Sequence, residues 1–100
     1  MKTNQCVQFG EFVRNTRISN GVTAREAAAA CDMLPSNFSK LEHGALQPPR
    51  DAGRQRMLAS AIGLAIDSFE AQEFFDLAAN ALQAVPVDIA DIISRDDAMP

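Results

Sequence analysis

The sequence predicts an all-α protein, with one small domain of about five helices followed by a short helical extension. Alanine, leucine and glutamate occur in blocks that are bounded by helix-capping residues. Nothing indicates a strand, because no alternating segment is flanked by an Asn-Gly or Asp-Gly turn, and tyrosine and tryptophan are absent. The chain has 100 residues, of which 47% are hydrophobic. This is enough for a single core that needs neither disulfides nor metals.

The first helix is expected from about Val7 to Ser19. The Asn-Gly pair that follows supplies its stop. Apolar or semi-polar residues recur on one face, at Phe9, Phe12, Val13 and Thr16.

The second helix is predicted to begin after Thr23. Thr23 and Glu26 have the spacing of a capping box, in which each side chain accepts a hydrogen bond from the other residue's amide. The segment "AREAAAAC" then consists mostly of strong helix formers. Its small residues Ala27 and Ala28 leave room for another helix to approach closely.

A third helix is predicted to start at Pro35, where a missing amide costs nothing, and to end before Gly44. Asp32 opens the turn that precedes it. A fourth helix is expected from the N-cap Asp51 to Ile62.

The C-terminal third is predicted to hold a fifth helix, from about Ser68 to Ala84. Asp67 and Glu70 have the spacing of a second capping arrangement at its start. A last short helix is expected from Pro86 to Ile93. Residues 1–66 are therefore assigned to the main domain and residues 67–100 to a helical extension.

Charge is distributed unevenly along the chain. The net charge of −4 argues at first against nucleic acid. However, residues 1–56 carry eight Lys or Arg against five Asp or Glu, whereas residues 57–100 carry Arg95 alone against eight acids. This asymmetry is typical of a protein with one end that meets phosphates. The alternative is a chance distribution of surface charge.

The segment "TAREAAAACDMLPSNFSKLEHG" resembles, position by position and without gaps, the helix-turn-helix of the Xre/Cro/lambda-repressor family. The similarity covers roughly residues 9–64 and implies a lambda-repressor-like DNA-binding domain. Asp32 stands where the family usually has glycine, and Leu34 where it usually has a Ser or Thr cap. The apolar positions of the motif are Ala27, Cys31, Met33, Phe38 and Leu41, and its small position is Ala28.

The third helix is expected to enter the major groove of DNA, where base edges offer distinct donors and acceptors. Phe38 and Leu41 face inward, and polar side chains face outward. For Asn37, the alternatives are a phosphate contact or a capping role, and Lys40 has the alternative of an ordinary solvated lysine. The residues predicted to contact bases are Pro35, Ser36, Asn37 and Lys40.

Contacts with phosphates are expected on both sides of this helix, because such contacts set the register of a protein on DNA. The start of the second helix offers backbone amides and a positive dipole end. Arg54 and Arg56 are assigned either to phosphates or to solvent. The predicted phosphate contacts are Thr23, Ala24, Arg25, His43 and Arg50. The resemblance also implies a structural ion pair between Arg17 and Glu42.

Catalysis is not expected. His43 is the only histidine, and no nucleophile or acid is placed to form a triad with it. Cys6 and Cys31 lack metal-ligand spacing, so a metal or cofactor is not expected. Residues 1–10 lack the apolar segment of a secretory signal, and no run of about 18 apolar residues would span a membrane. A cytoplasmic location is therefore expected.

The fifth helix carries a wide apolar stripe, of which half is expected to be core and the remainder a dimer or partner surface. That surface is assigned to Phe69, Phe74, Leu77, Val87, Ile89 and Ile92. The sequence thus predicts a homodimeric repressor that binds an inverted-repeat operator in double-stranded DNA. The alternative is an antitoxin or another interaction module that binds a partner protein, such as a toxin, and regulates its own promoter.

Overall fold

The computed structural model describes residues 5–84, which form five α-helices and no strand. The predicted all-α class is confirmed for this part of the chain. The last predicted helix, over residues 86–93, lies outside it. The helices are α1 (Gln5–Ser19), α2 (Ala24–Ala30), α3 (Pro35–Glu42), α4 (Ala52–Ala61) and α5 (Phe69–Ala84).

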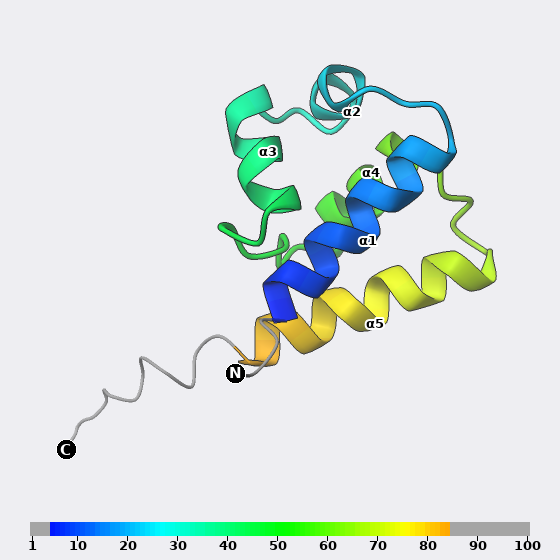
Figure 1. Cartoon of the computed structure of the whole chain (residues 1–100). Coiled ribbons are helices and arrows are strands. Elements are labelled where there is room, and N and C mark those ends of the chain that lie inside the picture. The colour runs from blue at the N-terminus through cyan, green and yellow to red at the C-terminus, as the bar shows by residue number, and fades with distance from the viewer. Residues whose placement is uncertain (1–4, 85–100) are drawn as a thin grey trace, which may run out of the picture.

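The central helix of the arrangement is α1, which lies between α3 and α5 (Figure 1). It runs antiparallel to α5, and the two helices diverge toward the end where α5 begins. Both α3 and α4 pack against α2. As a result, α3 lies at one side of the molecule and the start of α5 at the opposite side.

A single hydrophobic core joins all five helices. Its aromatic centre is Phe74, whose ring centroid lies 5.2 Å from that of Phe9 and 6.4 Å from that of Phe12. The side of α2 that faces the core consists of small residues, so its neighbours approach closely. The largest fully buried side chains are Phe9, Phe38, Phe74, Leu41, Leu58, Ile62 and Val13.

Local capping signals explain where α2 and α4 begin. Thr23 accepts a hydrogen bond of 3.0 Å from the Glu26 amide, and Glu26 accepts one of 3.0 Å from the Thr23 amide. The predicted capping box is therefore confirmed. Asp51 accepts from the Arg54 amide at 2.9 Å, as expected of an N-cap.

The connection between α2 and α3 contains Asp32 and Leu34, the two positions at which the sequence departs from the pattern of the family that it resembles. Asp32 adopts a φ of 59°, the left-handed region in which aspartate is tolerated better than most residues. Leu34 is the N-cap of α3 and provides no side-chain hydrogen bond. Pro35 follows at the first helical position, and Gly44 closes the helix with a φ of +81°.

The start of α5 corrects one prediction. The expected capping pair of Asp67 and Glu70 is wrong, because the helix begins one residue later than that pair requires. Ser68 is the cap: its Oγ accepts from the Ala71 amide at 3.1 Å and donates to the Ala65 carbonyl at 2.7 Å. Along residues 5–84, no helix combines the length and apolar character needed to cross a membrane.

Candidate nucleic-acid interface

The candidate interface is the exposed face of α3. Phe38 and Leu41 are buried in the core and fix this helix to the domain. The residues predicted to contact bases lie on the opposite side of the helix. Pro35, Ser36 and Lys40 are exposed there, and Asn37 is half-buried.

The orientation of α3 is set partly by the ion pair that the resemblance implied. The Nε atom of Arg17 on α1 lies 2.7 Å from Oε2 of Glu42, the last residue of α3. A second guanidinium nitrogen lies 3.3 Å from Oε1, and the third donates to the Val22 carbonyl at 3.0 Å. The two side chains are only 12% and 5% exposed. Because both charges are largely withdrawn from water, neither is well tolerated without the other.

Sequence reasoning missed a second determinant of this orientation, which is Gly10. A methyl group added at Gly10 would overlap the backbone oxygens of Leu41 and Glu42. The absence of a side chain therefore lets α1 press directly against the end of α3. The available signal was a glycine inside a helical pattern, which often marks a close packing contact.

Only some of the hydrogen-bond donors at the start of α2 are available to a phosphate. The Thr23 amide already donates to Glu26, and the Thr23 hydroxyl accepts from the Glu26 amide. The hydroxyl proton of Thr23 and the amides of Ala24 and Arg25 remain as donors at this helix end. The Glu26 carboxylate also occupies this end and reduces its positive potential.

His43 follows α3 and is exposed, with Nδ1 2.7 Å from the carbonyl oxygen of Ser39. A carbonyl can only accept, so Nδ1 carries a proton in this arrangement. The remaining nitrogen, Nε2, then accepts in the neutral ring and donates only in the imidazolium form. A contact between His43 and a phosphate therefore requires the charged ring.

The remaining cations of the candidate interface are exposed. Arg50 lies in the connection from α3 to α4, and Arg54 and Arg56 lie on α4. Among the residues that the structure describes, no ion pair joins Lys40 or Arg50 to a carboxylate. Both side chains are thus available to an external anion.

The predicted dimer or partner surface divides into three parts. Phe69 is 83% exposed, whereas Leu77 is half-buried and packs against the core. Phe74 is fully buried, so its assignment to this surface is wrong: α5 turns it toward α1, where it contacts Phe9. The remaining members, Val87, Ile89 and Ile92, lie outside the described residues.

The two cysteines are buried and carry no metal-ligand cluster within residues 5–84. Burial raises the pKa of the Cys6 thiol. Burial also raises the pKa of the Cys31 thiol, and its own backbone hydrogen bond and Arg54 oppose this shift. Both side chains therefore contribute to packing as neutral thiols.

No family model, curated protein or solved structure matches this chain. Two of the surfaces described above are chemically distinctive: the polar and basic face of α3, and the exposed aromatic residue at the start of α5.

Proposed function

We propose that this chain is a sequence-specific regulator that binds double-stranded DNA through α3. In this proposal, the fold is of the lambda-repressor type, and α2 and α3 form its helix-turn-helix. An α-helix fits the major groove, where the edges of the bases can be distinguished. The proposal extends the resemblance of residues 9–64 to the Xre/Cro/lambda-repressor family.

The observation that carries the proposal is the distribution of charge on α3. Its only acid, Glu42, is buried against Arg17, so no carboxylate faces outward. The exposed face instead presents Ser36 and Lys40, which donate hydrogen bonds to base edges. A surface that approaches a polyanion is expected to hide its acids in this way.

The position of the acidic residues supports the same proposal. Between Met57 and Ala84 the chain contains four acids and no Lys, Arg or His. These acids lie on α5 or just before it, on the opposite side of the molecule from the outward face of α3 (Figure 1). DNA bound at α3 would therefore not meet them.

We further propose a homodimer that occupies an inverted repeat and represses by blocking access to the operator. Two copies of α3 would then lie about 34 Å apart, which is one turn of DNA. This mechanism needs no cofactor. The contact between the two copies is assigned to the apolar residues of the C-terminal extension that come after these four acids in the sequence, which are Leu77, Val87, Ile89 and Ile92.

A second candidate function is that of an interaction module, such as an antitoxin, which binds a partner protein and regulates its own promoter. The observation in its favour is Phe69, a large hydrophobic side chain that is 83% exposed. Surfaces of this kind mark protein contacts when they form part of a larger site.

The proposal is tested by selecting the full chain against a random duplex DNA library at near-physiological salt. Enrichment of an inverted repeat with half-sites about ten base pairs apart is expected. The Lys40→Ala variant should change or lose the enriched sequence, whereas Arg14→Ala, an exposed change on α1, should not. A folded chain that enriches no sequence would contradict the proposal and favour the second candidate.

A further inference from the structure

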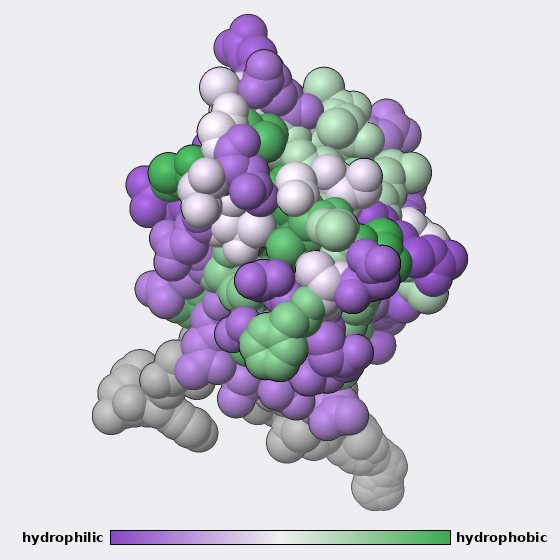
Figure 2. Space-filling view, turned by 90° about the vertical axis from the view of Figure 1, so that its right-hand side faces the viewer, coloured by the Kyte–Doolittle hydropathy of each residue, from purple (hydrophilic) through white to green (hydrophobic). Residues whose placement is uncertain are grey.

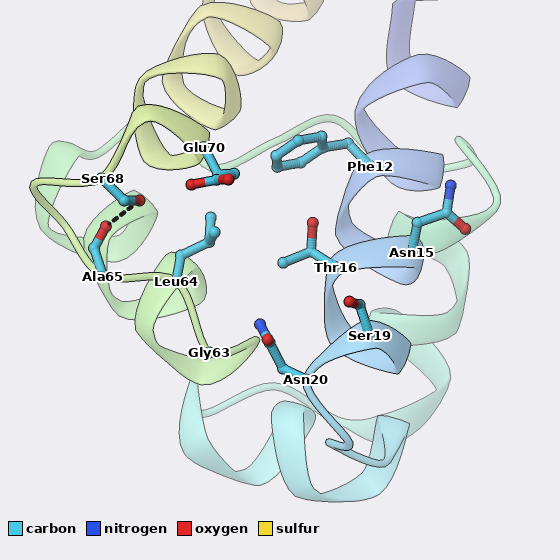
Figure 3. Close-up of a pocket in the computed structure, with 10 residues that line it drawn as sticks. All are labelled: Phe12, Asn15, Thr16, Ser19, Asn20, Gly63, Leu64, Ala65, Ser68 and Glu70. Atoms are coloured by element: carbon cyan, nitrogen blue, oxygen red, sulfur yellow. Dashed lines mark hydrogen bonds between the residues drawn. The ribbon is translucent and has the colours of Figure 1, made fainter.

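A pocket of about 590 Å³ lies where α1 and α5 diverge (Figure 3). Phe12 and Thr16 reach it from α1, Leu64 from the connection between α4 and α5, and Glu70 from the first turn of α5. In Figure 3 these side chains, together with Asn20, surround one shared space. The pocket joins segments that are far apart in the sequence and is separate from the outward face of α3.

The polar groups of this pocket favour a ligand that donates hydrogen bonds. Glu70 supplies a carboxylate, and the Thr16 hydroxyl can accept. Asn20 donates its Nδ2 to the Ile62 carbonyl at 3.0 Å, which leaves its Oδ1 as an acceptor. No Lys, Arg or His lines the pocket.

The apolar residues of the pocket further restrict the class of ligand that fits it. Phe12 and Leu64 offer hydrophobic surface next to these acceptors. Lysine and arginine side chains combine a long apolar stem with a cationic head that donates several hydrogen bonds. The pocket therefore has the chemistry to accept one such side chain, with its stem on Phe12 and Leu64 and its head toward Glu70.

Two large, exposed hydrophobic residues directly adjoin lining residues of the pocket in the sequence. Phe69 lies between two residues that line it, Ser68 and Glu70, and is 83% exposed. Ile66 directly follows the lining residue Ala65 and is 48% exposed. Figure 2 faces this end of the molecule and shows hydrophobic surface beside hydrophilic residues. Exposed apolar surface with polar residues around it marks protein-interaction sites, so Phe69 favours a protein as the ligand.

The negative charge of the surface around the pocket distinguishes between a second copy of the chain and a basic partner. Asp67, Glu70, Glu73 and Asp76 lie on α5 or just before it, and Glu73 and Asp76 share the exposed side of the helix with Phe69. A second copy docked face to face would oppose these carboxylates with the same carboxylates. Such like-charge contacts are unfavourable, whereas a basic surface would be attracted.

We propose that this pocket and Phe69 form a docking site for a basic segment of another protein. An arginine or lysine of that segment enters the pocket and meets Glu70, while an apolar neighbour packs on Phe69. The site lies at the opposite end of the molecule from α3 (Figure 1). The partner therefore does not compete with DNA for the same surface. The docking proposal does not depend on the proposed DNA binding.

The test is selection of a displayed random peptide library on the full chain. Peptides that combine Arg or Lys with aromatic or large aliphatic residues should be enriched. Phe69→Ser and Glu70→Gln should each weaken the selected peptides about tenfold, because each removes a central contact. Met57→Ser and Glu11→Gln are matched controls, since they make the same kinds of change at exposed positions on α4 and α1. The controls should leave peptide binding unchanged.

Three results would overturn the docking proposal. One is the absence of enriched peptides, and another is enrichment that Phe69→Ser leaves intact. The third is sedimentation showing a self-associated chain that Phe69→Ser converts to monomers, because a second copy would then occupy the site. Phe69→Ser should keep the wild-type result in the DNA selection, so failure of this proposal is distinguishable from failure of the proposed function.

Discussion

Arg17 and Glu42 join α1 to the end of α3 through an ion pair with a distance of 2.7 Å between Nε and Oε2. The same guanidinium also donates to the Val22 carbonyl in the loop before α2. One side chain therefore links the first helix, the following loop and the candidate DNA-binding helix. The arrangement of these three segments depends on a contact that is largely removed from solvent.

Replacement of Arg17 by alanine should be strongly destabilising. The change leaves the Glu42 carboxylate, whose side chain is 5% exposed, without its partner. The free energy of unfolding is expected to fall by about 3–5 kcal/mol. Urea unfolding followed by circular dichroism measures this, with Arg14→Ala expected to stay within about 0.5 kcal/mol of wild type. Equal losses in the two variants would contradict the structural role of the pair.

Gly10→Ala should also lower stability, although it adds a single methyl group. The new Cβ would overlap the backbone oxygens of Leu41 and Glu42, so α1 and α3 would have to separate. Overpacking of this kind costs about 1–3 kcal/mol. The control is Gly53→Ala in α4, where the added group meets only the Asp51 side chain and the change should stay within about 1 kcal/mol. Thermal unfolding that shows Gly10→Ala as stable as wild type would argue against this close contact.

Lys40→Ala and Arg50→Ala should separate base recognition from phosphate binding. Loss of Lys40 is expected to weaken specific DNA binding by about 1–3 kcal/mol and relax the preference at one base pair. Loss of Arg50 should weaken binding to all sequences and reduce the salt slope by about one. Fluorescence anisotropy at several salt concentrations, on the selected operator and on one-base variants, measures both effects. If neither substitution alters binding, α3 is not the DNA-binding helix.

Ser68→Ala should destabilise the start of α5. The Oγ of Ser68 accepts the Ala71 amide, and loss of such a cap typically costs about 1 kcal/mol. Asp67→Ala should cost less, because Asp67 is not the cap residue. Chemical unfolding of the two variants provides the comparison. A larger loss in Asp67→Ala would restore the capping role that the sequence suggested for Asp67.

The features that the sequence predicts well are those determined within one turn of helix. Thr23 and Glu26, or Asp51 and its helix, need only their spacing along the chain to form a cap. The start of α5 shows the limit of this reasoning, because Asp67 and Ser68 are both good capping residues in adjacent positions. The helix uses Ser68, whose Oγ accepts a hydrogen bond from the Ala71 amide, and spacing along the chain alone does not distinguish it from Asp67.

Features that depend on contacts between distant segments were not predictable. The apolar stripe of α5 includes both Phe69 and Phe74, and the sequence does not say which of them α1 covers. In the structure one is 83% exposed and the other is fully buried. The contact of Gly10 with α3 and the pocket beside Glu70 likewise depend on how whole helices are placed. The outward position of Lys40 was predictable, because Phe38 and Leu41 define the inward face of the same short helix.

The small size of α3 limits how far its function can be separated from the rest of the molecule. It has eight residues and no side-chain cap at its start. Isolated helices shorter than about 12–15 residues are marginal in water, so α3 keeps its shape only while Phe38, Leu41 and Glu42 are held by their neighbours. A peptide with the sequence of α3 alone would be unstructured, and grafting its outward residues onto another protein would succeed only on a scaffold that supplies equivalent support from behind.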